Sequence, residues 1–301
     1  MATESTPAPH PRPRPAIDAA LARRLVDTQF PHWAELPLKL LAPAGSDHVI
    51  YRLGEELSVR LPRHADAVGQ ARKEARWLPR LTPHLPLAVP EPVGVGEPGL
   101  GYPWAWAVSR WLEGEVATPE ALGDSPRAAV RLAEFLAALQ KCTPDAAEAA
   151  PEDVRADTLA DRDRDTRDAI GEVADVFDAE AMTTLWDAAL SAPGWDRAAV
   201  WCHGDLHTGN LLTVDGHLSA VIDFGELGVG DPACDLTIAF TLMSPGSRSV
   251  FRDALGVDDA TWTRGRGWAL ATGLNAYTTY AAENPRVAAQ TTRQITAALT
   301  G

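Results

Sequence analysis

Three residues of this chain, Asp205, Asn210 and Asp223, have the side-chain types and the spacing that phosphoryl transfer requires. Asp205 and Asn210 lie five residues apart in the stretch 201–210 (WCHGDLHTGN), and Asp223 follows thirteen residues later at the start of Asp-Phe-Gly. Asn and Asp oxygens suit Mg²⁺, which takes one or two protein ligands and completes its octahedron with phosphates and water. Asp205, held near the metal without ligating it, could accept the proton of a substrate hydroxyl. The pattern therefore favours a phosphotransferase.

A β-hairpin is expected to bring Asn210 and Asp223 together. Residues 211–214 and 217–223 are apolar and rich in β-branched side chains, and Asp215-Gly216 lies between them. Asp and Gly tolerate the positive φ of a type I′ turn, so this pair is a strong hairpin signal.

The register of that hairpin follows from the two-residue turn. Val214 is expected opposite His217, and Asn210 opposite Val221. Asp223 would then be a diagonal neighbour of Asn210 on one face, roughly 7–8 Å away at the backbone. The two side chains could share one small, hard cation.

These segments resemble the catalytic and metal-binding loops of the aminoglycoside phosphotransferase family, small-molecule relatives of protein kinases. The resemblance rests on residues 203–210, on Asp223-Phe-Gly225 and on residues 230–236 (GDPACDL), and covers about 36 residues. It implies a bilobal, kinase-like α+β fold in which the γ-phosphoryl group of ATP or GTP passes to a hydroxyl. Asp205 would orient and deprotonate that hydroxyl, Asn210 and Asp223 would hold Mg²⁺, and His203 would give structural support.

The first part of the chain is typical of a small antiparallel sheet, with strands at residues 36–41, 48–53 and 57–61. Gly45 and Ser46 lie in the turn after the first strand. We expect this turn to cover the nucleotide phosphates, although a single glycine there is also typical of a simple hairpin.

The family resemblance also implies a cation on the third strand that holds the α- and β-phosphates, and a carboxylate on the next helix that holds the cation. None of the three lysines lies on that strand, and Arg60 occupies the expected place. Glu74, in a helix expected over residues 65–81, is its predicted partner. The guanidinium of Arg is broader than the ammonium group of Lys, so Arg60 need not contact the phosphates as a lysine would. An alternative is that Arg60 is a surface residue and Arg63 makes the phosphate contact.

The segment between the two lobes is expected to read the nucleotide base. Residues 103–109 are typical of a buried strand, in which Trp104 and Trp106 face the core. Arg110, Trp111 and Leu112 then resemble the hinge, whose backbone groups bind the edge of adenine or guanine. Trp111 is the aromatic residue predicted to touch the base.

Composition indicates one globular enzyme with two lobes. The chain has 301 residues, 46% of them apolar. We expect a disordered proline-rich tail at 1–15, a nucleotide-clamping lobe with the hinge at 16–112, and a mainly helical catalytic lobe at 113–301. The helical lobe should contain helices near residues 125–142, 231–243, 258–284 and 285–299, with Asp231 and Asp235 in structural roles.

The same composition bears on the compartment. No run approaches the roughly 20 apolar residues of a membrane span, and the N-terminus has no apolar signal core. The three cysteines are too few and too scattered for a disulfide scaffold, so we expect a cytoplasmic protein, as a monomer or a homodimer.

The net charge of −14 bears on the substrate. It disfavours nucleic acid and anionic membranes and would steer cationic ligands, such as an aminoglycoside or a macrolide with an amino sugar, to the protein. An acidic surface also simply keeps a protein soluble.

Asp161 and Asp165 on a helical face, and Glu226 after the magnesium loop, are candidate contacts of such an acceptor. Arginines interleave with these aspartates, and Asp163–Arg167 and Arg164–Asp168 are i,i+4 pairs, which is typical of a solvated charged helix.

Alternatives remain for the function. His203-x-Asp205-x-His207 could ligate Zn²⁺ or Fe²⁺ in a hydrolase, although this leaves Asn210 and Asp223 unexplained. A kinase of a metabolite such as choline or a sugar fits the same motifs, as does a nucleotide-binding pseudokinase that acts as a sensor. A protein kinase is disfavoured, because only five residues separate Gly225 from Asp231.

Overall fold

The structure, a computed structural model, describes residues 16–41, 47–142 and 156–301. The chain divides into two compact units, Met1–Ala75 with Pro92–Trp111, and Arg76–Glu91 with Leu112–Gly301. The predicted boundary between residues 112 and 113 lies next to the last of these junctions, while residues 76–91 join the second unit. The predicted proline-rich tail lies outside the described residues.

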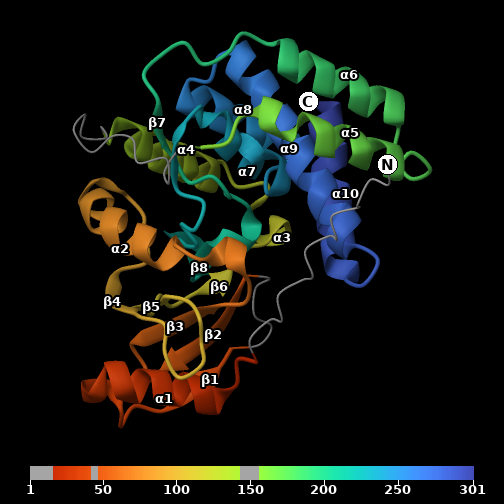
Figure 1. Ribbon diagram of the computed structural model, residues 1–301. Helices are drawn as coiled ribbons and strands as arrows, with labels where there is room; N and C mark the ends of the chain where they lie inside the picture. Colours follow the sequence, from red (N-terminus) through yellow and green to blue (C-terminus); the bar gives the residue numbers. More distant parts are fainter. Residues whose placement is uncertain (1–15, 42–46, 143–155) are drawn as a thin grey trace, which may run out of the picture. The chain divides into compact units, whose positions relative to one another are not determined.

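The first unit is built on a five-stranded antiparallel sheet of strand order β1-β2-β3-β5-β4 (Figure 1). The strands are β1 (Leu38–Leu40), β2 (His48–Leu53), β3 (Leu57–Pro62), β4 (Pro92–Gly96) and β5 (Trp106–Arg110). Helix α1 (Ala19–Gln29) buries Leu25 and Val26 in one hydrophobic core with Tyr51 and Trp106 of the sheet. The predicted strands therefore form, and β1 and β4 lie at the two edges.

The prediction of one continuous helix over residues 65–81 is wrong for its first residues, because the helix begins only at Gln70. A 3₁₀ turn, η2 (Ala65–Ala67), is separated from helix α2 (Gln70–Leu81). Val68 has an extended ψ of 131° and Gly69 a φ of +102°, and neither angle continues a right-handed helix.

The second unit is mainly helical, with two small sheets. Its helices and 3₁₀ turns are η3 (Thr82–His84), α3 (Pro119–Leu122), α4 (Pro126–Lys141), η5 (Leu159–Arg162), α5 (Asp163–Glu172), α6 (Ala179–Ser191), η6 (Thr208–Asn210), η7 (Pro232–Leu236), α7 (Thr237–Thr241), α8 (Pro245–Leu255), α9 (Asp259–Tyr280) and α10 (Pro285–Thr300). Its strands are β6 (Glu115–Val116), β7 (Val200–Cys202), β8 (Leu211–Val214), β9 (His217–Val221) and β10 (Gly228–Gly230). The sheets have the orders β6-β8-β9 and β10-β7.

The helix starts read from the sequence are confirmed. Ser125 accepts the N–H of Ala128 at 3.2 Å and is followed by proline, so α4 begins with a side-chain cap. Asp231 caps η7 by accepting the N–H of Ala233 at 3.0 Å. Among the described residues, no helix is both long and apolar enough to cross a membrane.

The hairpin of β8 and β9 has the predicted turn. Asp215 and Gly216 have φ values of +51° and +72°, and Val214 pairs with His217. Positive φ at both central positions is the requirement of a type I′ turn. The residue types of the turn thus determine its geometry.

The predicted register beyond the turn is wrong by one residue. Leu211 pairs with Val221, and the carbonyl of Asn210 accepts the N–H of Ile222 at 2.9 Å. The cause is a bulge at Ser219, whose carbonyl accepts the N–H of Ala88 at 3.1 Å and so leaves the hairpin ladder. Asn210 therefore lies opposite Ile222, one residue before Asp223.

Candidate active site

The loop that carries Asp205 is held by a buried carboxylate. β7 ends at Cys202, and the next two backbone N–H groups, of His203 and Gly204, donate to Oδ2 and Oδ1 of Asp235 at 2.8 and 2.9 Å. Asp235 is fully buried, and burial raises the pKa of its carboxyl above the ordinary value. The structural role predicted for Asp235 is thus anchoring of the loop.

Gly204 is required by the geometry of the loop. Its φ is +86°, and a Cβ at this position would lie 2.3 Å from the carbonyl oxygen of Glu226. A side chain would therefore push the loop away from the segment after Asp223. Glu226 itself is exposed, and its predicted contact with an acceptor stays a prediction.

His203 lies beneath the loop, where both ring nitrogens are engaged. Its Nδ1 accepts the N–H of Asp205 at 3.3 Å, and its Nε2 donates to the carbonyl of Ile222 at 3.0 Å. The ring also packs on Phe224, with centroids 4.6 Å apart. His203 supports the loop, as the sequence suggested, and has no free nitrogen for a metal.

Asn210 is oriented by the backbone and side chain of Asp205. Its amide nitrogen donates to the Asp205 carbonyl at 2.8 Å and to Oδ2 at 3.2 Å. Because both partners are acceptors, the nitrogen of the amide is committed and Oδ1 is the atom that can meet a cation. Asp223, close by in the hairpin, has a φ of +65°. Asp is one of the few residues other than glycine that adopt this left-handed conformation readily.

The carboxylate of Asp205 is half exposed and lies beside His207. The distance from Oδ2 to Nε2 of His207 is 3.6 Å, while Nδ1 of His207 accepts the N–H of Gly209 at 3.0 Å. Burial alone would lower the pKa of His207, but the hydrogen bond to Asp205 and the charges of Asp205 and Asp223 raise it. The sequence indicated His207 only as a polar loop residue or a metal ligand, and its contact with Asp205 was not predicted. Its position two residues after Asp205 is the signal that could have indicated this contact.

The predicted cation on the third strand has the predicted partner. In the first unit, Nη1 of Arg60 on β3 lies 2.9 and 3.0 Å from the two carboxylate oxygens of Glu74 on α2. Glu74 is buried and Arg60 nearly so. The alternative, Arg63, instead donates from Nε to the carbonyl of His48 at 3.0 Å. Gly45 and Ser46 lie outside the described residues.

The backbone of the predicted hinge is partly occupied within the first unit. The N–H of Trp111 donates to the carbonyl of Glu56 at 2.7 Å, so it cannot also bind a nucleobase. The guanidinium of Arg52 lies 4.7 Å from the centre of the Trp111 ring. Contacts of a base with Arg110, Trp111 or Leu112 stay predictions, restricted to the remaining backbone and ring groups.

The two acidic candidates on the charged helix differ in their surroundings. Asp161 completes a capping box with Thr158, the N-cap of η5, because its Oδ2 accepts the N–H and the hydroxyl of Thr158, each at 2.8 Å. Asp165 lines a cavity of about 210 Å³ between α5 and α9. Other residues that line this cavity are Arg162, Asp168, Glu172, Trp268 and Asn275. Asp161 therefore has a structural role, and Asp165 faces space that a ligand could enter.

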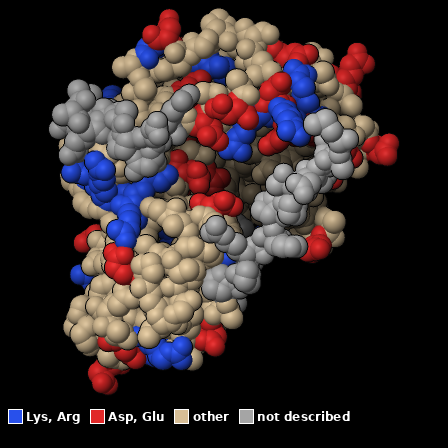
Figure 2. Space-filling view, viewed as in Figure 1, with Lys and Arg blue, Asp and Glu red and all other residues tan. Residues whose placement is uncertain are grey.

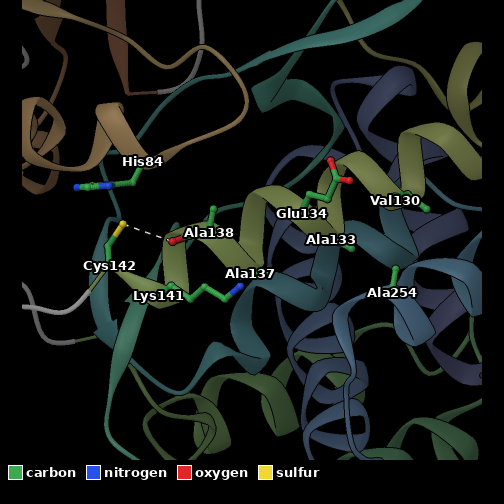
Figure 3. Close-up of a pocket in the computed structure, with 9 residues that line it drawn as sticks. All are labelled: His84, Val130, Ala133, Glu134, Ala137, Ala138, Lys141, Cys142 and Ala254. Atoms are coloured by element: carbon green, nitrogen blue, oxygen red, sulfur yellow. Dashed lines mark hydrogen bonds between the residues drawn. The ribbon is translucent and has the colours of Figure 1, made fainter.

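A larger cavity of about 820 Å³ lies along α4 and contains none of the predicted site residues (Figure 3). Its lining runs from His84 and Cys142 to Ala254 of α8, and Cys142 donates to the carbonyl of Ala138 at 3.4 Å. Four of its nine lining residues are alanine, and Cys142 is the last described residue before the gap at 143–155. Because this cavity contains none of the predicted site residues, it is separate from the candidate site, which consists of the loop around Asp205 and the residues at the base of the hairpin.

Comparison with known proteins places this geometry among phosphotransferases. The profile of the phosphotransferase enzyme family matches residues 39–268. No curated protein sequence matches the chain.

Several solved structures share the fold. The GDP and kanamycin complex of APH(2")-IIia has a TM-score of 0.72 at 18% identity, over 93% of this chain and 98% of that one. The apoenzyme of macrolide 2'-phosphotransferase MphH from Brachybacterium faecium has a TM-score of 0.61 at 24% identity, over 91% and 95%. The ternary complex of streptomycin, ATP and APH(2")-IIa has a TM-score of 0.61 at 16% identity, over 94% and 98%. The predicted kinase-like α+β fold is confirmed.

Proposed function

The chain belongs to the phosphotransferase enzyme family, and from this premise we propose that it transfers the γ-phosphoryl group of ATP or GTP to a hydroxyl of a cationic small molecule. Asp205 is the base, and Asn210 and Asp223 hold Mg²⁺. The observation that carries the proposal is the orientation of Asn210, whose amide nitrogen is bound to Asp205 and whose oxygen is left for a cation.

The donor set fits magnesium. Asn210 and Asp223 offer oxygen atoms, which Mg²⁺ prefers, and two protein ligands leave room for nucleotide phosphates and water. When bound, Mg²⁺ would neutralise charge that develops on the transferred phosphoryl group.

Asp205 is suited to accept a proton. Its side chain is half exposed, so a substrate hydroxyl can reach it, and its backbone is fixed by His203 and Asn210. The N–H of Asp205 is held by His203, and its carbonyl by the amide of Asn210. Such fixation favours catalysis mainly by positioning, which is the principal contribution expected of a phosphotransferase.

The pair of Arg60 and Glu74 supplies the cation for the nucleotide. Nη1 of Arg60 contacts both carboxylate oxygens of Glu74, which fixes the guanidinium on β3, where the nucleotide phosphates are expected. Related structures were solved with GDP, ADP and ATP, so the choice between ATP and GTP is open to measurement.

A cationic acceptor fits the charge of the protein and of one cavity. The net charge is −14, and Figure 2 shows several groups of acidic side chains on one face of the molecule, with basic side chains among them and one basic cluster at the left of the view. Asp165, Asp168 and Glu172 contribute three carboxylates to the cavity between α5 and α9, against one cation from Arg162. Its volume of about 210 Å³ suits an amine-bearing ring of an acceptor. Similar folds bind kanamycin, streptomycin and gentamicin.

We place the enzyme in the cytoplasm as a monomer or a homodimer. All three cysteines are unpaired, which is typical of a reducing compartment.

The test is a panel of acceptors with ATP and with GTP. The purified protein is incubated with Mg²⁺, one nucleotide and one acceptor, which is an aminoglycoside, a macrolide, choline or a sugar. Phosphorylated products are detected by mass spectrometry. The proposal expects a phosphorylated cationic acceptor, with nucleotide consumption that depends on that acceptor and stops when Mg²⁺ is chelated.

Two results would contradict it. Nucleotide-dependent thermal stabilisation without turnover of any acceptor would indicate a sensor instead of an enzyme. Phosphorylation of choline or a neutral sugar alone would retain the chemistry and overturn the acceptor class.

A further inference from the structure

A second group of metal-ligating side chains lies directly behind the catalytic loop. Cys202 is the last residue of β7, and Cys234 and Asp235 lie in η7. All three are buried, and their ligand atoms lie within 4.8 Å of one another. In the described part of the chain this is the one group of three or more His, Cys, Asp or Glu residues that meets this spacing.

A backbone oxygen completes the group. The carbonyl oxygen of Asp231 lies 3.5 Å from Sγ of Cys202 and 3.4 Å from Sγ of Cys234. Sγ of Cys234 is also 3.8 Å from Oδ1 of Asp235. Two sulfur atoms and two oxygen atoms therefore lie within a few ångströms of one another.

These separations match the edges of a zinc tetrahedron. With Zn–S bonds of about 2.3 Å and Zn–O bonds of about 2.0–2.2 Å, a sulfur and an oxygen ligand lie about 3.5–3.7 Å apart. The distances from the Asp231 carbonyl to the two sulfurs, 3.5 and 3.4 Å, lie near that range, and the distance from Cys234 to Asp235 is slightly longer at 3.8 Å. Little movement of the protein would be needed to surround a cation.

We propose that Cys202, Cys234 and Asp235, with the carbonyl of Asp231, form a binding site for a thiophilic divalent cation of the Zn²⁺ or Cd²⁺ type. Thiolate ligands select such ions over Mg²⁺, which prefers oxygen. On binding, the two S–H bonds break, two sulfur–metal bonds form, and two protons leave to solvent, while Asp235 binds as a carboxylate. Two thiolates and one carboxylate then compensate the two positive charges within the buried site.

The site is coupled to the catalytic loop through Asp235. Oδ1 of Asp235 accepts the N–H of Gly204 and also faces Cys234, so a cation on this oxygen competes with the anchoring of the loop. A bound thiophilic cation should therefore weaken the anchoring of the loop and shift Asp205. It would do so without binding to the proposed magnesium ligands, Asn210 and Asp223. The existence of the metal site does not depend on the proposed function.

The experiment measures metal binding without turnover. Chelator-treated full-length protein, in buffer with excess Mg²⁺, is titrated with Cd²⁺, and the sulfur-to-cadmium charge-transfer absorption and the release of protons are followed. Wild type should bind one equivalent and release two protons. Cys142→Ser is the matched control, because Cys142 follows the last residue of α4 and lies outside the group, and it should behave as wild type.

The variants Cys202→Ser and Cys234→Ser should each bind Cd²⁺ at least tenfold more weakly, with a reduced absorption band. Circular dichroism of each variant checks its fold. Unchanged binding in both folded variants would overturn the proposal, and so would the absence of a charge-transfer band in wild type at one equivalent, whatever the variants do. Neither result bears on phosphoryl transfer, which the acceptor panel tests separately.

Discussion

Two regions of the second unit are rich in carboxylates, and they use them in opposite ways. At the catalytic loop, Asp235 is fully buried and accepts two backbone N–H groups, which fixes the path of the chain before Asp205. Along η5 and α5, acidic residues pair with arginines in solvent. These pairs are Asp157–Arg162 at 2.6 Å, Asp163–Arg167 at 2.8 Å and Asp168–Arg164 at 3.8 Å.

The difference shows how carboxylates can be assigned. An exposed ion pair at i,i+4 spacing contributes about 0–1 kcal/mol and occurs on many helices. A buried carboxylate is costly unless hydrogen bonds compensate it, and the two backbone N–H groups bound to Asp235 do so here. The loop therefore carries the functional assignment, while the charged helix contributes part of the wall of one cavity, including Asp165, and one capping contact, from Asp161.

The largest effect on stability is expected at Asp235. Asp235→Ala leaves the N–H groups of His203 and Gly204 without an acceptor, at a cost of about 1–3 kcal/mol each, so the free energy of unfolding should fall by about 2–6 kcal/mol. Denaturant titration measures this loss, and phosphoryl transfer should fall with it because the loop loses its anchor. Asp235→Asn keeps one acceptor oxygen and should lose about half as much. A loss below about 0.5 kcal/mol in Asp235→Ala, the range of surface substitutions, would show that the loop is held by other contacts.

A smaller effect is expected on the charged helix. Asp161→Ala removes the acceptor of the Thr158 N–H and hydroxyl, and should reduce the free energy of unfolding by about 1 kcal/mol, as is usual for a lost cap. Asp168→Ala, which removes only an exposed pair, should stay within about 0.5 kcal/mol of wild type. Equal losses in the two variants would contradict the distinction between cap and surface pair.

The smallest effect concerns His207 and depends on pH. Its folded-state pKa is raised by Asp205 and Asp223, so its contribution to stability is complete below the unfolded pKa of about 6.5 and is lost as pH rises through the folded pKa. At pH about 5.5 the free energy of unfolding of wild type should be higher than that of His207→Gln by about 1 kcal/mol or less. The difference should shrink at higher pH. Urea unfolding across this range tests the sign, since a difference that grows with pH would reverse it.

Local sequence rules predicted the elements whose causes are local. The turn at Asp215-Gly216 and the helix starts at Ser125 and Asp231 follow from residue types within a few positions, and all three are confirmed. The bulge at Ser219 could not be predicted, because its cause is a hydrogen bond to Ala88, more than a hundred residues away. Long-range pairing of this kind leaves no local pattern.

The candidate site shows the same division. The spacing of Asp205, Asn210 and Asp223 indicated which residues gather in the loop and hairpin, whereas the supporting contacts depend on tertiary structure. The Arg60–Glu74 pair was predicted from the family resemblance and is present. The hydrogen bond that occupies the N–H of Trp111 was not predicted, because it depends on the position of Glu56 beside the end of β5.

Turnover of Asp205→Asn, compared with Asp215→Asn, tests the central claim most directly. In the first variant the amide of Asn210 keeps its bond to the backbone carbonyl of residue 205, so the loop should stay folded while the base is lost. Asp215 lies in the turn, at a φ of +51° that Asn tolerates, and serves as the matched control. With an acceptor identified by the panel, kcat should fall by about 10²- to 10⁴-fold in Asp205→Asn and stay near wild type in Asp215→Asn. Wild-type turnover in a folded Asp205→Asn protein would contradict the assignment of Asp205 as the base.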